Sequence, residues 1–243
     1  KNILIYICLY EHNSIDFILS LKPDGLKINS SDLNNPLMLN KISKLRIPIN
    51  LSVGSSTVDE INYALKFFKN KTNLNLMYGF QSFPTPIDAI NIQNIKYLSK
   101  KYKLKVGYQD HSPGEDLSGF YLPAYAIGIG AQIIEKHITL NRKMPGPDHK
   151  ASLEPKEFKL MVQNIKDVLK ALGSKKKKVT LSEKKNIFIA RKSIVAKKNI
   201  LKGEFFNYKN LTTKRPGNKT SASKWYQLIG KRALKNYFKD DFI

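Results

Sequence analysis

The sequence predicts an α/β protein that contains most of a (β/α)8 TIM-type barrel, followed by a small β-rich domain. Apolar runs of strand character recur along the first part of the chain, with starts 22 to 30 residues apart. Amphipathic helical patterns lie between these runs, so strand and helix alternate. Such βα units have parallel strands, because each helical crossover returns the chain to the same end of the sheet.

Six strands are expected from the apolar runs. They occupy residues 3–10, 25–30, 47–54, 74–80, 104–110 and 132–139. The helical patterns occupy residues 14–21, 36–45, 57–68, 90–102, 122–130 and 155–173. The third pattern opens with Thr57 and Glu60 at the spacing of a capping box, and the last repeats apolar residues at i, i+3, i+4 and i+7.

The number of units falls short of a closed barrel, which needs eight βα units. The chain begins at Lys1, without methionine, and already in an apolar run. We therefore expect that residues 1–173 form a partial barrel lacking about its first two βα units. An open six-stranded α/β sheet is the alternative, although it would leave unpaired edges.

The character of the sequence changes after Gly173. Residues 174–186 are rich in charge and poor in apolar side chains, which is typical of a linker. Residues 187–243 show short strands and turns that are too short for βα units. They predict a second, β-rich domain, small enough to depend on a partner for part of its stability.

Composition limits the class of protein. The net charge of +23 comes largely from scattered lysines, with one dense run at 175–178 in the expected linker. Scattered charge argues against a nucleic-acid interface, so we expect no nucleic-acid partner. We expect no membrane partner either, because every apolar run is shorter than the roughly 18 residues of a membrane span. The single cysteine, Cys8, excludes an internal disulfide and fits a cytoplasmic location.

Polar side chains gather where the expected strands end, which is the active face of an α/β barrel. Alternation puts Glu135 and His137 on one side of the last strand, and Gln109 and His111 on one side of the strand before it. The two imidazoles therefore end neighbouring strands at the same level. With the adjacent carboxylates they predict a divalent metal site of Zn, Mn or Fe type. A pair of capping or packing histidines is the alternative.

An anion site is predicted at the end of the second expected strand. Lys27 ends this strand, and Ser30 follows it ahead of a helical pattern. An ammonium group, a hydroxyl and a helix N-terminus together suit a phosphate or carboxylate. A solvated surface lysine is the alternative, because lysine is abundant in this chain.

Several motifs resemble a single enzyme family along essentially the whole chain. They are KINSSD (27–32), VGYQDHSPG (106–114), EKHIT (135–139), PGPDH (145–149) and KRPGN (214–218). In this order they resemble the sialic acid synthase family, which makes N-acetylneuraminate and related nonulosonates. The C-terminal segment resembles the antifreeze-like, or SAF, domain of that family.

The resemblance implies a barrel enzyme that condenses phosphoenolpyruvate with an N-acetylated sugar such as N-acetylmannosamine, releasing phosphate by C–O cleavage, in surface polysaccharide biosynthesis. It implies that His111 and His137 bind a divalent ion, Mn²⁺ before Mg²⁺ or another metal. It also implies that Lys27 and Ser30 hold the phosphate of phosphoenolpyruvate.

The same resemblance implies two further contacts to substrate. Asp148 would contact the acceptor sugar, and Arg215 would reach from the SAF domain of a partner into the active site of a domain-swapped homodimer. Glu135 faces the same rim as the histidines. We therefore name Glu135, Asp148 and Arg215 as the catalytic candidates.

The chain departs from the family pattern at three positions. Gln81 and Phe83 stand where Asn and Tyr are common before PTP, and Gln109 stands where the DH motif usually has serine. We expect these three side chains to contact substrate in a reshaped pocket, which leaves the sugar open. The candidate general base of the family falls in the units expected to be missing, so we expect the 243-residue chain alone to be inactive.

Two other functions stay open at this stage. One is a different metal-dependent barrel enzyme, such as an aldolase, and the other is a carbohydrate- or nucleic-acid-binding module without catalysis. Phosphate release that depends on phosphoenolpyruvate selects the synthase over the aldolase. Salt-sensitive binding to polyanions, indifferent to the two histidines, would indicate the binding module.

Overall fold

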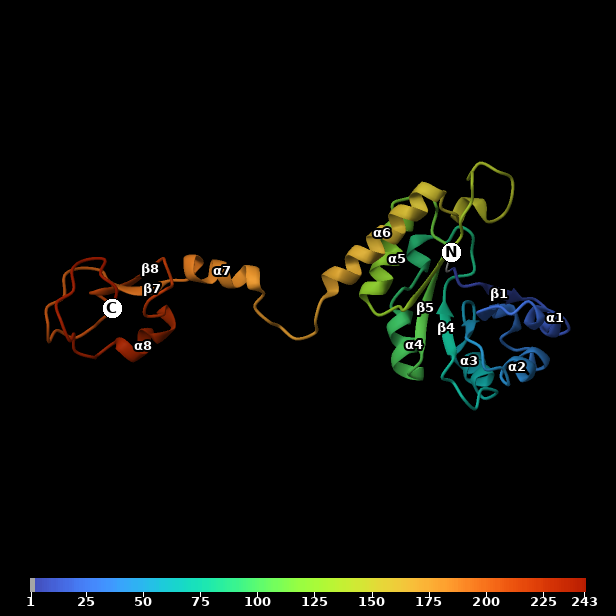
Figure 1. Cartoon of the computed structure of the whole chain (residues 1–243), viewed down its shortest axis with the longest axis horizontal. Helices are drawn as coiled ribbons and strands as arrows, with labels where there is room; N and C mark the ends of the chain where they lie inside the picture. Colours follow the sequence, from blue (N-terminus) through green and yellow to red (C-terminus); the bar gives the residue numbers. More distant parts are fainter. Residues whose placement is uncertain (1–2) are drawn as a thin grey trace. The chain divides into compact units, whose positions relative to one another are not determined.

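The computed structural model describes residues 3–243, so Lys1 and Asn2 of the expected partial barrel lie outside the described residues. The chain divides into two units, Lys1–Gly173 and Ser174–Ile243 (Figure 1). Each unit has its own buried apolar cluster. The two units are therefore described separately.

The first unit is built on a six-stranded sheet in which neighbours in sequence are neighbours in space. Each neighbouring pair is parallel, as the alternation of strand and helix predicts. The strands are β1 (Tyr6–Leu9), β2 (Gly25–Ile28), β3 (Ile49–Ser52), β4 (Leu74–Tyr78), β5 (Lys105–Asp110) and β6 (Ile133–Lys136). Each lies within its predicted run and is shorter than that run.

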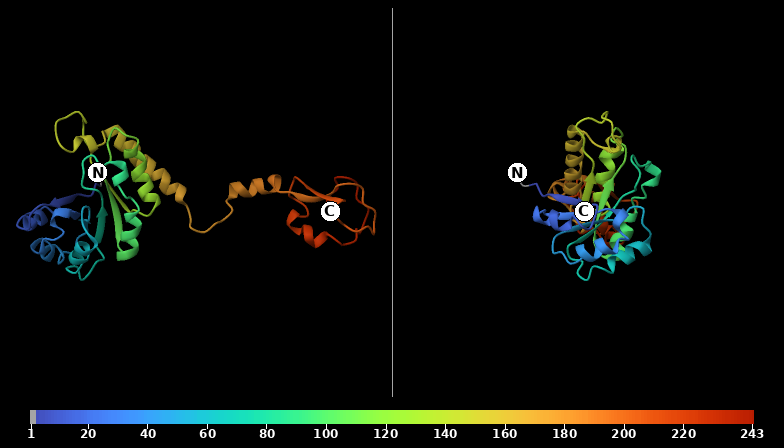
Figure 2. Two further views of the ribbon diagram at one scale, coloured as in Figure 1. Left: turned by 180° about the vertical axis from the view of Figure 1, so that it is seen from behind. Right: turned by 90° about the vertical axis from the view of Figure 1, so that its right-hand side faces the viewer.

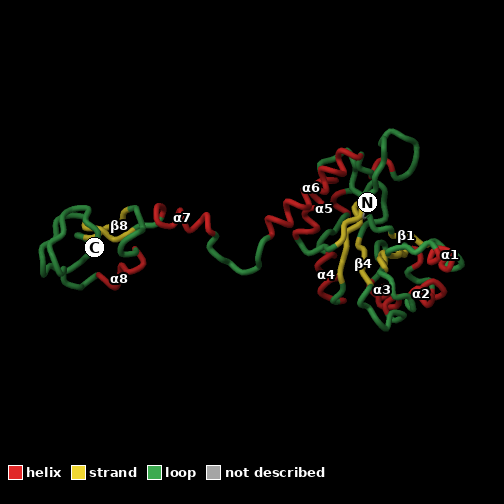
Figure 3. Tube along the Cα trace, in the orientation of Figure 1, coloured by secondary structure: helices red, strands yellow, loops and turns green. Residues whose placement is uncertain are grey.

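Helices follow the strands along the chain (Figure 3). They are α1 (Ile15–Ser20), α2 (Pro36–Ile42), α3 (Val58–Leu65), α4 (Asn94–Tyr102), α5 (Ser118–Gly128) and α6 (Pro155–Leu172). The predicted capping box begins α3, where the Thr57 side chain accepts from the backbone N–H of Glu60 and the Glu60 side chain accepts from that of Thr57. The boundaries of α4 and α5 differ from the prediction by four residues each, because helix ends carry the weakest periodic signal.

The sheet separates an apolar outer layer from a polar concave face. Leu26, Ile28, Leu51, Leu76 and Val106 point outward and are buried in one cluster with apolar residues of the helices. Alternation therefore directs the side chains between them to the opposite face. On that face Lys27 is in register with Asn50 of β3, and Asn50 is in register with Asn75 of β4.

One ion pair shows how strongly the sheet curls. Lys27 Nζ of β2 lies 2.5 Å from Glu135 Oε1 of β6, although three strands separate β2 from β6 in the sheet. In a flat sheet, four strand spacings of about 4.8 Å would put these strands roughly 19 Å apart. The six strands therefore form part of a TIM-type barrel, seen from two further sides in Figure 2, and the predicted fold class is confirmed.

The second unit contains a small antiparallel sheet. Strands β7 (Ser193–Ala196) and β8 (Leu211–Lys214) pair with each other, and isolated bridges such as Ile200 with Tyr237 extend the β structure. The helices of this unit are α7 (Leu181–Ala190) and α8 (Trp225–Leu228). Its core is formed by Ile194, Ala196, Ile200, Phe206, Leu211 and Ala233.

The start of this unit contains a helix that the sequence analysis did not indicate. Helix α7 covers the second half of the expected linker and residues 187–190, the first four of the expected β-rich domain. The reason is a capping box in which Thr180 and Glu183 exchange side-chain and backbone hydrogen bonds. The spacing of these two residues is a helix-start signal in the sequence, whereas the surrounding charge is typical of a linker.

No helix within residues 3–243 is both long and apolar enough to cross a membrane.

Candidate active site

A cavity of about 260 Å³ opens at the carboxyl ends of the strands in the first unit. It is lined by Tyr10, Lys27, Asn29, Ser30, Ser31, Gln81, Phe83, Gln109, His111, His137 and Asp148. Two larger cavities among residues 3–243 have no histidine in their linings. Most of the predicted site residues of the first unit thus line one cavity, whereas Glu135 is not part of its lining. Tyr10 and Asn29 were not predicted, although they follow β1 and β2 directly.

The two imidazoles lie side by side in this cavity. The ring centroids of His111 and His137 are 5.4 Å apart, and the planes are tilted by 42°. Nδ1 of His111 lies 2.9 Å from the backbone carbonyl oxygen of Phe80. A carbonyl oxygen only accepts, so Nδ1 carries the proton and Nε2 keeps its lone pair.

Burial favours the neutral form of His111. The ring is 5% exposed, and this burial lowers the pKa of His111 below its ordinary value of 6.5, against an opposing effect of the hydrogen bond to Phe80. Metal binding requires the neutral ring. The site thus presents one imidazole whose free nitrogen is available at neutral pH.

Phe83 packs against both imidazoles. Its ring centroid lies 4.3 Å from that of His111 and 6.1 Å from that of His137, with a near-perpendicular arrangement in the second pair. Aromatic pairs at such distances are favourable contacts. Phe83 therefore limits how far the two histidine rings can turn, a role that its position before PTP did not indicate.

A chain of polar contacts crosses the concave face below the histidines. Glu135 Oε1 accepts from Lys27 Nζ at 2.5 Å and from Gln109 Nε2 at 2.9 Å. Gln109 Nε2 also donates to Ser52 Oγ at 3.1 Å. A carboxylate oxygen only accepts hydrogen bonds, so the side-chain amide of Gln109 must turn its donor, Nε2, toward Glu135. Gln109 Oε1 is then left buried and without a hydrogen-bond partner in the described part of the chain, ready to accept from a ligand.

The histidine pair fits a metal site with open positions. Among residues 3–243 there is no group of three or more His, Cys, Asp and Glu side chains that could hold a metal ion. The two histidines provide two protein ligands, fewer than the four of a closed structural site. Two imidazoles suit a divalent transition ion whose other positions are taken by water or substrate oxygen.

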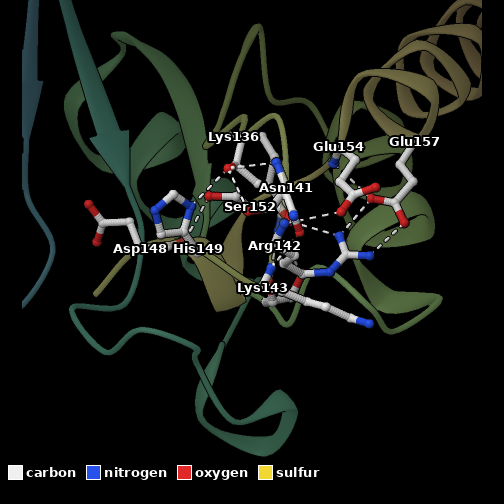
Figure 4. A network of polar contacts seen from close by, with 11 residues as sticks. Lys136, Asn141, Arg142, Lys143, Asp148, His149, Ser152, Glu154 and Glu157 are labelled. Carbon is white, nitrogen blue, oxygen red and sulfur yellow. Dashed lines mark hydrogen bonds and ion pairs between the residues drawn. The ribbon is translucent and has the colours of Figure 1, made fainter. Parts of the chain in front are cut away.

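The loop between β6 and α6 places Asp148 at the cavity. His149 Nδ1 lies 2.8 Å from Thr139 Oγ1, and Ser152 Oγ donates to the Asp148 carbonyl at 2.7 Å (Figure 4). Further along the loop, Arg142 donates to both carboxylate oxygens of Glu157, at 2.6 and 2.7 Å. This network holds both ends of the exposed PGPDH turn, so the Asp148 side chain is presented at the cavity without a partner of its own among the described contacts.

The sequence matches a known family over most of its length. Residues 1–177 match the NeuB family, and residues 191–243 match the SAF domain. This chain belongs to the NeuB family. The resemblance to sialic acid synthases with a C-terminal SAF domain is thereby confirmed.

Relatives of this NeuB-family chain are synthases of nonulosonic acids. It is 42% identical to the N,N'-diacetyllegionaminic acid synthase of Campylobacter jejuni, over 100% of this chain and 72% of that protein. It is 32% identical to a pseudaminic acid synthase of the same species, over 97% of this chain and 68% of that protein. The solved N-acetylneuraminic acid (sialic acid) synthetase of Leptospira borgpetersenii, in complex with citrate, superposes with a TM-score of 0.70 at 32% identity, covering 76% of this chain and 64% of that one.

Arg215 is the predicted site residue that the first unit does not contain. It follows β8 in the NeuB-family chain and is exposed, and the turn after it is held by a hydrogen bond of 2.8 Å from Ser193 Oγ to the Pro216 carbonyl. A second bond of 2.7 Å runs from Gly217 N to the carbonyl of Phe188. The guanidinium group is therefore presented on a well-anchored turn of the second unit.

Proposed function

We propose that this chain catalyses the condensation of phosphoenolpyruvate with an N-acetylated sugar to form a nonulosonic acid, with release of phosphate. Membership of the NeuB family supports the class of enzyme. The observation that carries the proposal is the cavity in which a lysine, a serine, two imidazoles and an aspartate converge from four different loops and strand ends. Such convergence at the carboxyl ends of barrel strands is typical of a catalytic site.

Lys27 and Ser30 are proposed to bind the phosphate. Lys27 is the second-last residue of β2, and Ser30 opens the short 3-10 helix Ser30–Asp32 that follows it. Charge-assisted hydrogen bonds from an ammonium group are among the stronger contacts to a phosphate. In the structure the ammonium group is paired with Glu135. Binding of a phosphate dianion would give Lys27 a second anionic partner.

His111 and His137 are proposed to hold a divalent ion, Mn²⁺ in the first place. When bound, such an ion supplies Lewis-acid polarisation of the sugar aldehyde, which prepares the carbonyl carbon for attack by the enol carbon of phosphoenolpyruvate. The chain's own residues orient the two substrates. Asp148 at the cavity entrance suits the hydroxyl groups of an acceptor sugar, and Arg215 from a partner copy suits a carbonyl or carboxylate oxygen.

Three side chains are proposed to shape the sugar pocket. Gln81 and Phe83 line the cavity from the segment after β4, and Gln109 lines it from β5. Phe83 offers an apolar ring, and Gln109 offers an unpartnered carbonyl oxygen in a buried position. A ligand with a hydroxyl or amide N–H at that point would satisfy this acceptor, which favours a sugar bearing a donor there.

The test is phosphate release from phosphoenolpyruvate in the presence of Mn²⁺ and a panel of N-acetylated sugars. It is run on the 243-residue chain and on the same chain extended at its N-terminus by the two βα units expected there, taken from the Campylobacter legionaminic acid synthase. We expect sugar-dependent release from the extended protein. Absence of release with each sugar of the panel, in a protein that binds phosphoenolpyruvate, contradicts the proposed reaction.

A further inference from the structure

A buried ion pair lies directly behind the two histidines. Asp110 precedes His111 and Lys136 precedes His137, so alternation points both side chains away from the cavity. Lys136 Nζ lies 2.9 Å from Asp110 Oδ2, and neither side chain has any exposed surface. The outer face of these neighbouring strands therefore carries a pair of opposite charges in an otherwise apolar layer.

Both charged groups have further hydrogen-bond partners besides each other. Asp110 Oδ1 accepts from the Tyr108 hydroxyl and from Ser112 N, each at 3.0 Å, and Oδ2 accepts from Ser112 Oγ at 2.9 Å. Lys136 Nζ also donates to the Ser112 carbonyl at 2.8 Å. This cluster ties the end of β5, the turn after it and the end of β6 into one unit.

The pair stands at the last rung of the ladder between β5 and β6. Asp110 and Lys136 are the final register partners, and the two histidines come after them. The His111 carbonyl accepts from Thr85 N at 2.8 Å, whereas the His137 carbonyl accepts from Leu153 N at 3.0 Å. The histidine backbones are therefore anchored to different segments, and the ion pair is what joins the two strand ends next to the rings.

Stability alone is a weak reason for such a pair. Removing two charges from water carries a large desolvation cost, and apolar side chains of similar volume often stabilise a protein as well or better. What the pair adds is a defined distance between two strand ends, through short and directional contacts. A metal site depends on such distances, and outer-shell partners that orient metal ligands commonly alter metal affinity when they are changed.

We propose that Asp110 and Lys136 are positioning residues that hold His111 and His137 at the separation needed to bind one divalent ion. This inference rests on the proposed role of the two histidines in metal binding. It assigns the ion pair no contact with metal or substrate. Its effect is carried through the backbone, because each charged residue is bonded directly to the histidine that follows it.

The test compares Mn²⁺ affinity in variants of the 243-residue chain, using electron paramagnetic resonance of free Mn²⁺. The double variant Asp110→Leu/Lys136→Met removes both charges while keeping most of the volume, and circular dichroism checks that it folds. We expect its Mn²⁺ affinity to fall at least about tenfold. With Co²⁺ as the probe, a changed absorption spectrum would report altered ligand geometry, which a purely stabilising pair would not produce.

Two controls separate this inference from the proposed function. Lys41→Met/Asp16→Asn removes an ion pair on the outer surface of the first unit and should leave Mn²⁺ affinity unchanged. His111→Ala and His137→Ala should each abolish binding, and wild-type affinity in either would show that the metal site itself is wrong. If both histidine variants lose the ion while the folded Asp110→Leu/Lys136→Met variant binds as tightly as the wild type, the positioning role is wrong.

A milder variant covers the case in which the double variant does not fold. Ser112→Ala removes one hydroxyl donor to Asp110 and leaves the two charges paired. We expect a severalfold loss of Mn²⁺ affinity in a protein with an unchanged far-ultraviolet spectrum. Unaltered affinity in folded Ser112→Ala overturns the proposal.

Discussion

The ammonium group of Lys27 and the carboxylate of Glu135 meet across the concave face, 2.5 Å apart, although they belong to strands separated by three others. Both side chains retain some exposure, 23% and 30%. An ion pair that is partly open to solvent contributes little to stability, up to about 1 kcal/mol. We therefore attribute its importance to the cavity, where it keeps a cation and an anion in defined positions, and not to holding the barrel together.

The first prediction concerns Lys27. In Lys27→Met, the affinity for phosphoenolpyruvate should fall by roughly 10- to 100-fold, because a hydrogen bond to a charged group contributes about 1.5–3 kcal/mol. Isothermal titration calorimetry measures the change. The control is Lys41→Met, which removes a lysine that is paired with Asp16 on the outer surface. Equal losses in the two variants would show that Lys27 acts only through net charge.

The second prediction concerns two glycines with different surroundings. A Cβ on Gly79 would lie 2.6 Å from the backbone carbonyl oxygen of Gln109, whereas a Cβ on Gly128 would meet nothing within 4 Å. Gly79→Ala should therefore destabilise the first unit by about 1–3 kcal/mol, since β5 must move. Gly128→Ala, at the end of α5, should stabilise it by up to about 1 kcal/mol. Thermal melts of the two variants should shift in opposite directions, and a shift in the same direction would contradict the packing described for Gly79.

The third prediction concerns acid stability. Hydrogen bonds from Arg142 lower the pKa of Glu157 below its ordinary value of 4.5. The folded state therefore binds fewer protons than the unfolded state in this range, so the stabilisation is fully present above pH 4.5 and is lost as pH falls through the lower folded pKa. In Glu157→Gln the free energy of unfolding should depend less on pH below 4.5. Urea melts of the first-unit transition between pH 3 and 7 measure this.

Arg142→Met provides the matching control for that measurement, because it removes the cause of the lowered pKa and leaves the carboxyl group in place. It should flatten the acid limb to a similar extent, with a change of up to about 1 kcal/mol at neutral pH. A wild-type pH dependence in both variants would mean that the pair does not contribute to acid stability.

The fourth prediction tests whether Arg215 acts in a partner's active site. In the extended protein, His111→Ala and Arg215→Ala should each be inactive. In a domain-swapped dimer, mixing the two should restore about a quarter of the activity, because half of the dimers contain one site with both residues intact. The mixture is prepared by unfolding and refolding equal amounts. If it stays inactive while mixed dimers are shown to form, Arg215 serves its own chain or serves no catalytic role.

Much of the fold was predictable because its signal is local. The alternation of apolar runs with amphipathic patterns located the strands and helices of the first unit, and Thr57 with Glu60 predicted the start of α3 correctly. Thr180 and Glu183 have the same spacing at the start of α7, a helix that the sequence analysis did not predict. Periodicity is weak in that segment, where lysines surround the few apolar residues of the helix.

The candidate site was partly predictable, because the carboxyl ends of parallel strands all lie at one edge of the sheet. This argument placed His111 beside His137 and brought Lys27 and Gln109 to the same cavity. It could not show that Phe83 covers both rings, or that the Phe80 carbonyl selects the tautomer of His111. Those contacts depend on the path of the segment after β4, which has no repeating pattern.

The sequence by itself determined the order of the units, the face on which each polar side chain lies and the membership of the NeuB family, because strand alternation and motif spacing are properties of the chain alone. Only the tertiary structure decided which of those side chains touch. The curl of the sheet brings Lys27 to Glu135, and the last rung of the β5–β6 ladder buries Asp110 against Lys136. Such contacts join residues far apart in sequence, so their existence depends on curvature and packing that no local pattern encodes.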